Sequence, residues 1–283
     1  MSSASPRLAV LGSANVDYVV RVSTLPTAGE TVVGGDVMRV MGGKGANQAA
    51  VAASLGVATT FLGAVGTDRD GDDAIAALGD LGVDVSHVSR VATSTGVALI
   101  AVGFDGDNQI VVSPGANVHA TASAEVISAC DVLLAQLEIP HDVVARAAQS
   151  ASLFVLNVAP ANTVDPQLVA AADLVIANET EWAAVGASVT GPAIVTLGAR
   201  GARWVHGGEI VAEVAAPPVD VMDAVGAGDA FSAAATWRFA LGDSPIEVLR
   251  FAAAAGSLAT TGPGARGHLP TVKEVESWLA RGW

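Results

Sequence analysis

The sequence predicts an α/β protein, organised as a three-layer α/β/α sandwich with a mainly parallel central sheet and a small β-sheet lid. Three observations predict this class. Short, wholly apolar segments alternate with helical patterns along most of the 283 residues. Two segments interrupt that alternation with hairpin patterns. The hydrophobic residues, 51% of the chain, are dispersed so that no apolar run could span a bilayer, and a chain of this length can bury a large core.

Six apolar segments predict the strands of the central sheet. In chain order they are "LAVLG" at 8–12, "TTFLGAVG" at 59–66, "VLLAQL" at 132–137, "LFVLNV" at 153–158, "LVIAN" at 174–178 and "AIVTLG" at 193–198. Strands that are apolar throughout are buried on both faces, and strands separated by helices pair in parallel. We therefore expect a parallel sheet that helices cover on both faces.

Helical patterns fill the intervals between these strands and close the chain. The expected helices span 46–55, 72–81, 141–150, 166–172, 227–241, 245–260 and 271–281. The alanine-rich helix at 227–241 follows a glycine-spaced turn. The result is the regular βα alternation of a sheet with helical layers.

The two interrupting segments, 17–43 and 95–115, have the pattern of paired short strands joined by Pro/Gly or Asp-Gly turns. Such hairpins do not fit easily into a parallel sheet, so we place both together as a small lid over its carboxyl edge, where ligands of open α/β sheets bind. No repeat, low-complexity tract or linker divides the chain. We expect a single domain over 1–283, with the lid formed by about 17–43 and 95–115.

Composition narrows the classes of partner. The chain has 14 basic and 28 acidic residues, a net charge of −14, and no basic cluster. Nucleic acid and anionic membrane surfaces require clustered Lys and Arg, so neither is an expected partner. The first residues lack the apolar core and cleavage site of a signal peptide, so we expect a cytoplasmic location. Cys130, the single cysteine, excludes an internal disulfide and is expected to be a small buried hydrophobe.

The common nucleotide-binding motifs are absent. Met38 stands where a Walker A loop ending at Lys44 needs its first glycine, and Gly45 stands where the loop needs Ser or Thr. Neither "GSANVD" nor "GAGDAF" contains G-x-G-x-x-G, so dinucleotide binding is poorly supported. Lys44 is nevertheless unusual, because the only other lysine is Lys273.

The stretch "GAGD" at 226–229 opens a helix and suits phosphoryl transfer. Gly226 and Gly228 let the backbone turn so that the N–H groups of Ala227, Gly228 and Asp229 converge on an anion. Asp229 would then be placed to accept the proton of an attacking hydroxyl. The alternative is an ordinary N-cap aspartate after a glycine turn, and the motif alone does not separate the two.

Two further motifs offer groups that recognise hydroxyls. "GGKGAN" permits close backbone approach at Gly42 and Gly43 and puts Asn47 in the first turn of a helix, although it is also typical of a glycine-rich helix start. "GSANVD" places Asn15 and Asp17 at the end of the first strand. Carboxylates and amides bind vicinal hydroxyls well, but such a pair is often only a turn.

Three more polar positions follow later strands. "NETE" supplies Asn178 and Glu181, which are oxygen ligands suited to Mg²⁺ or, alternatively, caps of a helix. "TLGARG" at 196–201 would place small residues against a nucleotide base or ribose, and Glu138 ends another strand. All these groups fall at carboxyl ends of strands, whereas unrelated decorations would be scattered over both ends.

Together these residues resemble the ribokinase branch of the PfkB-type carbohydrate kinases. The similarity extends from about Arg7 to Pro270 in the family's order. Two signatures carry it, "GGKGANQAAVA" and "DAVGAGDAF", with "STGVALI", "QLE", "NETE" and "LGARG" between them. The resemblance implies a ribokinase-like fold, use of ATP with Mg²⁺, activation by a monovalent cation, usually K⁺, and a homodimer.

The resemblance also assigns roles to residues. Asp229 would be the catalytic base, and the amides of Gly226, Ala227 and Gly228 would form the anion hole. The sugar would be bound by Asn15, Asp17, Gly43, Lys44, Asn47, Glu138 and Asp229. The nucleotide would contact Asn178, Thr196, Gly198, Gly201 and Gly228, with Glu181 serving Mg²⁺ through water. The monovalent cation would be held by Asp223 with backbone carbonyls such as those of Val225, Thr260 and Gly264.

Three departures from the family pattern bear on cation dependence and nucleotide preference. Ala224 replaces the usual Thr, which removes a hydroxyl but leaves the backbone cradle. The chain between Glu181 and Thr196 is much shorter than in typical members, so we expect one helix beside the nucleotide to be missing. "GARGH" puts His268 about where a small polar residue is expected.

The predicted activity is transfer of the γ-phosphoryl group of ATP to a primary hydroxyl, with D-ribose to ribose 5-phosphate as the leading case. A kinase for a nucleoside or for another furanose or ketose is an alternative, although Asp17 with "GGKGAN" favours a free sugar. A noncatalytic sugar-binding sensor on the same fold would have lost the base or the anion hole, and both are intact. The apolar segments "YVV" and "TVV" predict a homodimer through the lids.

Overall fold

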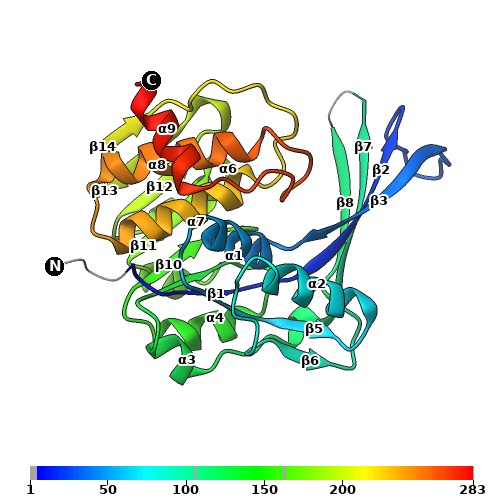
Figure 1. Ribbon diagram of the computed structural model, residues 1–283, viewed down its shortest axis with the longest axis horizontal. Helices are drawn as coiled ribbons and strands as arrows, with labels where there is room; N and C mark the ends of the chain where they lie inside the picture. Colours follow the sequence, from blue (N-terminus) through cyan, green and yellow to red (C-terminus); the bar gives the residue numbers. More distant parts are fainter. Residues whose placement is uncertain (1–4, 105–106, 162–163, 283) are drawn as a thin grey trace.

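The computed structural model describes residues 5–104, 107–161 and 164–282, and a large sheet forms its body (Figure 1). The sheet has eight strands in the order β14-β13-β12-β11-β10-β9-β1-β4. The parallel strands are β1 (Leu8–Leu11), β4 (Thr59–Leu62), β9 (Val132–Ala135), β10 (Phe154–Asn157), β11 (Leu174–Asn178) and β12 (Ala193–Thr196). The mainly parallel sheet predicted from the apolar segments is confirmed.

Two parts of this sheet differ from the expectation. The strand expected at 59–66 is interrupted at Gly63, where a side-chain carbon would lie 2.6 Å from the Gly12 carbonyl oxygen. The chain leaves the large sheet there, and β5 (Ala64–Gly66) pairs instead with β6 (Ser89–Val91). At the other edge, β13 (Ala202–His206) and β14 (Glu209–Val214) add an antiparallel hairpin that was not predicted from the sequence.

Helices cover both faces of the large sheet, which gives the three layers. One buried cluster joins the sheet to α1 (Lys44–Ser54), α2 (Arg69–Gly79), α7 (Ala227–Ala240), α8 (Pro245–Ala259) and α9 (Val272–Arg281). The other joins it to α3 (Ala124–Ser128), α4 (His141–Ala148), α5 (Pro166–Ala170) and α6 (Glu179–Val185). Short 3₁₀ segments occur at Gly115–His119, Gly186–Ser188 and Gly198–Arg200. Within the described ranges, no helix is both long and apolar enough to cross a membrane.

The first strand shows how the sequence produces these layers. Leu8 and Val10 join the α1-side cluster, whereas Ala9 and Leu11 join the opposite one. Successive side chains of a strand point to opposite faces, so a strand between two helical layers must be apolar at every position. Four alanines in the middle of α7, Ala230 and Ala233 to Ala235, are fully buried, which lets this helix pack closely against α1 and α8.

The two interrupting segments form one small sheet that extends away from the body (Figure 1). Its strand order is β3-β2-β7-β8, with β2 (Asn15–Val22), β3 (Gly34–Gly42), β7 (Gly96–Gly103) and β8 (Asn108–Ser113). Each hairpin is antiparallel, and β2 and β7 join the hairpins in parallel. The expected small sheet is confirmed, while its Asp-Gly turn at 105–106 lies outside the described residues. Because β2 begins four residues after β1 ends, the sheets meet at residues 12–17, which include the polar side chains of Ser13, Asn15 and Asp17.

Candidate active site

The polar residues expected at the carboxyl ends of the strands lie together. Glu138 follows β9, and its Oε2 accepts hydrogen bonds from the Ser13 hydroxyl and, at 3.0 Å, from the Lys44 backbone N–H. Lys44 opens α1 after Gly43, whose φ is 88°. A side-chain carbon at Gly43 would lie 2.8 Å from the Asn15 nitrogen, so only glycine fits there. These contacts join the loop after β1, the start of α1 and the segment after β9 into one site.

Asp229 is a buried carboxylate within this site. It lies in the first turn of α7 and is 7% exposed. Its Oδ2 accepts a hydrogen bond from Asn47 Nδ2 at 3.0 Å, and its Oδ1 accepts one from Gln48 Nε2 at 3.1 Å. Both oxygens therefore face α1, unlike those of a capping aspartate, which bind the amides of their own helix. Burial raises the pKa of Asp229. The Lys44 charge and these two amide donors oppose that rise.

Two cations share this region with the carboxylates. Burial tends to lower the pKa of the Lys44 ammonium, but the charges of Asp229, Glu138 and Glu181 outweigh it and raise that pKa. Arg266, from the loop between α8 and α9, donates from Nε to Asn47 Oδ1 at 2.9 Å. Burial lowers the pKa of Arg266 to about 10, so it still carries its charge at neutral pH.

Asp17, on β2, has a carboxylate oxygen without a partner. Its Oδ1 is buried and accepts no hydrogen bond within the described structure. Burial and the nearby Glu138 raise the pKa of Asp17 to about 6, against the influence of Arg266. Gly42 packs against this carboxylate, because a side-chain carbon there would lie 2.2 Å from Oδ2. A ligand hydroxyl would supply the missing donor.

Replacing Asp17 with Asn should stabilise the free protein at neutral pH. The carboxyl ionises with a pKa of about 6 in the folded protein against an ordinary pKa of 3.8, so its charge destabilises the folded state at pH values above 3.8. At about 1.4 kcal/mol per pKa unit, the gain approaches ~3 kcal/mol at neutral pH and disappears as the pH falls toward ~4. Thermal unfolding of both proteins across this pH range measures the gain. A difference in Tm that is the same at every pH would contradict the raised pKa.

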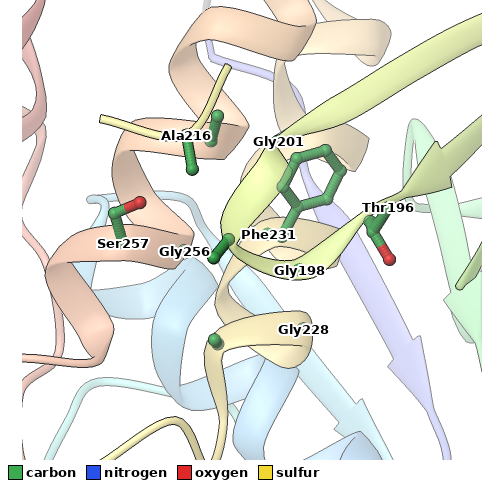
Figure 2. Close-up of a pocket in the computed structure, with 11 residues that line it drawn as sticks. Thr196, Gly198, Gly201, Ala216, Gly228, Phe231, Gly256 and Ser257 are labelled. Carbon is green, nitrogen blue, oxygen red and sulfur yellow. The ribbon is translucent and has the colours of Figure 1, made fainter. Parts of the chain in front are cut away.

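A cavity of about 160 Å³ lies where the carboxyl end of β12 meets the helices α7 and α8 (Figure 2). Four of the five expected nucleotide-binding residues line it: Thr196, Gly198, Gly201 and Gly228. Apart from Phe231, the lining residues are small, so much of the cavity wall is backbone. Asn178, the fifth expected residue, is not part of the lining.

The first turn of α7 opens toward this cavity. Gly226 has a φ of 84°, and a side-chain carbon there would lie 2.6 Å from the Cα of Ala265. At Gly228 no atom lies within 4 Å of such a carbon, so the approach from the cavity is open. The Ala227 amide already donates to the Ala224 carbonyl at 3.3 Å. The amides of Gly228 and Asp229, which have no carbonyl of their own helix to bind, are the available anion donors.

Asn178 and Glu181 form a capping box at the start of α6. Asn178 Oδ1 accepts from the Glu181 backbone N–H, and Glu181 Oε2 accepts from the Asn178 backbone N–H, both at 2.8 Å. Capping was the alternative interpretation of this motif, and the structure shows it. Glu181 is also half-buried, which raises its pKa, and the Lys44 charge opposes that rise. The carboxylate thus reaches the edge of the site while it caps its helix.

Asp223 ties the loop before α7 to the loop after α8. Its Oδ1 accepts from the Val225 backbone N–H at 3.0 Å, and its Oδ2 accepts from the Gly264 backbone N–H at 2.9 Å. The Thr260 carbonyl accepts from the backbone N–H groups of Met222 and Asp223. The four residues expected around a monovalent cation are therefore close together, but the Thr260 carbonyl is already engaged by two donors.

The match to a known family covers almost the whole chain. The model of the pfkB family of carbohydrate kinases matches residues 5–272. This chain belongs to that family. The resemblance seen in its sequence motifs is confirmed, and the pfkB signatures coincide with the starts of α1 and α7 described above.

Several relatives of this pfkB family member are named ribokinases. The chain is 36% identical to the ribokinase of Bacillus subtilis, over 96% of this chain and 99% of the relative. It is 34% identical to that of Haemophilus influenzae, over 96% and 98%. The structure of Arabidopsis thaliana ribokinase complexed with ribose and ATP superposes with a TM-score of 0.87 at 32% identity, covering 97% of this chain and 99% of that one. The ribokinase-like fold is confirmed.

Two of the departures from the family pattern are visible in the structure. His268 lies with Nδ1 at 2.5 Å from Thr261 Oγ1 and Nε2 at 3.3 Å from Glu274 Oε1, so it attaches its loop to α9. After α6 the chain passes only through the short 3₁₀ segment at Gly186–Ser188 before it enters β12.

Several residues of the site were not singled out in the sequence. Gln48 contacts Asp229, Arg266 contacts Asn47, and Ser13 contacts Glu138. Gln48 and Ser13 adjoin motif residues, so proximity to a motif was the available signal. For Arg266 the sequence gives no local signal, because its partner Asn47 lies 219 positions away.

Proposed function

We propose that this pfkB kinase is an ATP-dependent ribokinase, which converts D-ribose and ATP to ribose 5-phosphate and ADP. The observation that carries the proposal is the position of Asp229, buried against the amides of α1 and one residue from the open Gly228 at the cavity. A proton acceptor beside an anion site is what phosphoryl transfer to an alcohol requires. Full-length similarity to ribokinases supports ribose as the acceptor.

In the proposed reaction, the primary hydroxyl oxygen of ribose attacks the γ-phosphorus of ATP. A bond forms between these two atoms, and the bond from the γ-phosphorus to the β–γ bridging oxygen breaks. ADP leaves with that electron pair. The hydroxyl proton passes to the Asp229 carboxylate, which later releases it to solvent. The free amides at the start of α7 stabilise the charge of the transferred group.

The remaining groups of the site would bind and orient ribose. We assign sugar contacts to Asn15, Asp17, Gly43, Lys44, Asn47 and Glu138, in addition to Asp229. Asp17 offers a buried acceptor without a donor. Two adjacent hydroxyls of a pentose can satisfy such acceptors at once, and binding then compensates the cost of burying them.

We place the nucleotide phosphates at the start of α7 and its base and ribose along Thr196, Gly198, Gly201 and Gly228, with Asn178 at the margin. Among the described residues no three His, Cys, Asp or Glu side chains cluster as metal ligands. Mg²⁺ would therefore be held mainly by the ATP phosphates, with Glu181 reaching it through water, and this suits its preference for keeping several waters. When bound, Mg²⁺ neutralises charge on the phosphates.

We further propose a monovalent cation, K⁺, beside the Asp223 loop, with carbonyls of Val225 and Gly264 as candidate ligands. The Thr260 carbonyl would have to release one of its two backbone donors to join them. The carboxylate of Asp223 accepts two backbone hydrogen bonds and keeps lone pairs for a cation. Because the same loop leads into Gly226, a cation that fixes the loop would also fix the position of the start of α7.

The small sheet is proposed to act as a lid of a single kinase domain spanning the chain. Its strands β2 and β3 carry Asp17 and Gly42, so movement of the sheet would open or complete the sugar site. Closure would exclude water, which otherwise competes as the acceptor. Because the reaction consumes ATP, we propose a cytoplasmic location.

We also propose a homodimer through the lids, since large apolar side chains are exposed on the small sheet. Leu99 and Val111, which are paired neighbours on β7 and β8, are 55% and 67% exposed. Light scattering at micromolar concentration should give twice the mass of one chain. Leu99→Glu combined with Val111→Glu should give a monomer, while Ile210→Glu, at a similarly exposed residue of β14, should not. A monomeric wild-type protein would refute the dimer.

An ADP-release screen tests the proposed function and its alternatives. Pentoses, hexoses and nucleosides are offered with ATP and Mg²⁺, in K⁺ and again in Na⁺. D-ribose should give the highest kcat/KM, with faster turnover in K⁺, and phosphorus NMR should show phosphate on the primary hydroxyl. A higher kcat/KM for a nucleoside or another sugar would replace ribose as the substrate. Sugar binding without ADP release would mean a binding protein.

A further inference from the structure

A chain of buried amide side chains leads to Asp229 from the strand ends. Gln48 and Gln136 are fully buried, and Asn157 is 7% exposed. Gln48 Nε2 donates to Asn157 Oδ1 at 2.9 Å and to Asp229 Oδ1 at 3.1 Å, while Gln48 Oε1 accepts from Gln136 Nε2. Asn157 Nδ2 in turn donates to the Ile176 carbonyl at 3.1 Å.

These hydrogen bonds allow only one orientation of the Gln48 amide. The Ile176 carbonyl can only accept, so it takes the Asn157 NH₂ group and turns the Asn157 oxygen toward Gln48. Gln48 must then present its own NH₂ group to that oxygen, and the second hydrogen of this group meets Asp229. A reversed Gln48 would place its oxygen against two acceptors, Asn157 Oδ1 and Asp229 Oδ1. Desolvated mismatches of this kind are costly.

We propose that Gln48 is a positioning residue of the phosphoryl-transfer reaction: held from behind by Asn157 and Gln136, it keeps the Asp229 carboxylate oriented and able to accept a proton. The inference rests on the proposed function. Gln48 has no exposed surface, and of its three hydrogen-bond partners only Asp229 is a proposed reacting residue, so its effect on the reaction passes through Asp229. Asn47 differs, because it is one of the residues proposed to contact the sugar.

The electrostatics around Asp229 agree with this role. Burial raises its pKa, and hydrogen bonds from Asn47 and Gln48 act in the opposite direction. The charged groups that face it from neighbouring elements are Lys44 on α1, Glu138 after β9, Asp17 on β2, Glu181 on α6 and Arg266 after α8. None of them is altered by substitution of Gln48, so a shift in the pH profile would be due to the lost donor.

The test is the pH dependence of kcat at saturating ribose and ATP. Gln48→Met removes the donor and should move the acid limb upward by about one pH unit, with kcat about tenfold lower on the limb and nearly unchanged on the high-pH plateau. Gln48→Glu keeps the shape but turns a second carboxyl toward Asp229, so its limb should move further. Titration of Asp17 is expected in kcat/KM for ribose rather than in kcat.

Thr236→Val serves as the control for loss of a buried polar group. Thr236, on α7, is fully buried like Gln48, but its hydroxyl donates to the Ser232 carbonyl and not to Asp229. It should lower stability without moving the limb. Carbon NMR titration of the Asp229 carboxyl in the free protein should show the same upward shift in the Gln48 variants, and it needs no turnover. Folded Gln48→Glu protein with the limb and the carboxyl titration at wild-type pH would overturn the proposal. A wild-type protein without ribose-dependent ADP release would overturn the proposed function alone, since the NMR test remains.

Discussion

Asp229→Asn is expected to lower kcat by roughly 10²-fold or more, which is the usual scale for removal of a general base. The amide cannot take the hydroxyl proton, and the neighbouring donors of Asn47 and Gln48 would meet an NH₂ group on one side. Sugar binding should change modestly, because most of the proposed sugar contacts remain. Steady-state ADP release gives kcat, and calorimetric titration gives the Kd for ribose.

The matched control is Asp165→Asn, which removes a carboxylate from the N-cap of α5 on the other face of the sheet. Its kcat should stay at the wild-type value. Turnover near the wild-type value in Asp229→Asn would remove this carboxylate from the mechanism, whereas equal losses in both variants would mean that the effect is one of stability.

Gly226→Ala should also reduce kcat by about 10² to 10³-fold, the scale for loss of an oxyanion donor. The new methyl group would lie 2.6 Å from the Ala265 Cα, on a residue with a φ of 84°. The start of α7 must shift to relieve this contact, and the amides of Gly228 and Asp229 shift with it. The Asp229 carboxylate would lose its alignment at the same time.

Gly242→Ala is the control for Gly226→Ala, because it introduces the same backbone strain without displacing the start of α7. Gly242, just after the C-terminal end of α7, has a φ of 80° but no atom within 4 Å of an added side-chain carbon. It should cost about 1–2 kcal/mol of stability through its left-handed conformation and leave kcat unchanged. Kinetics and thermal unfolding of both variants check this. Equal kcat in the two variants would show that the geometry at Gly226 does not matter for the reaction.

The parts of the fold that could be predicted are those that a local sequence pattern determines. A strand buried between two helical layers must be apolar at each position, so all six parallel strands stood out. The β13–β14 hairpin did not, because an edge hairpin needs only one buried face and its strands mix apolar with charged residues. Its turn at Gly207 and Gly208, both with positive φ, was the signal that could have revealed it.

The residues of the site likewise differ in whether a local sequence pattern reveals them. Asn47, Glu138 and Asp229 were found because each follows a strand or opens a helix within a motif, and parallel strands bring their carboxyl ends to one edge. Arg266 and the amide chain through Gln48 and Asn157 were not found. The pairs Gln48–Asn157 and Arg266–Asn47 join residues more than a hundred positions apart, and nothing in a local pattern encodes such a distance.

The most direct test of the central claim is a crystal structure of the protein with ribose and a nonhydrolysable ATP analogue. We expect the primary hydroxyl of the sugar within about 2.6–3.2 Å of an Asp229 carboxylate oxygen. The terminal phosphate should lie against the backbone amides of Gly228 and Asp229. A complex in which that hydroxyl and phosphate meet at another acidic residue, with Asp229 still bound only to Asn47 and Gln48, would contradict the account.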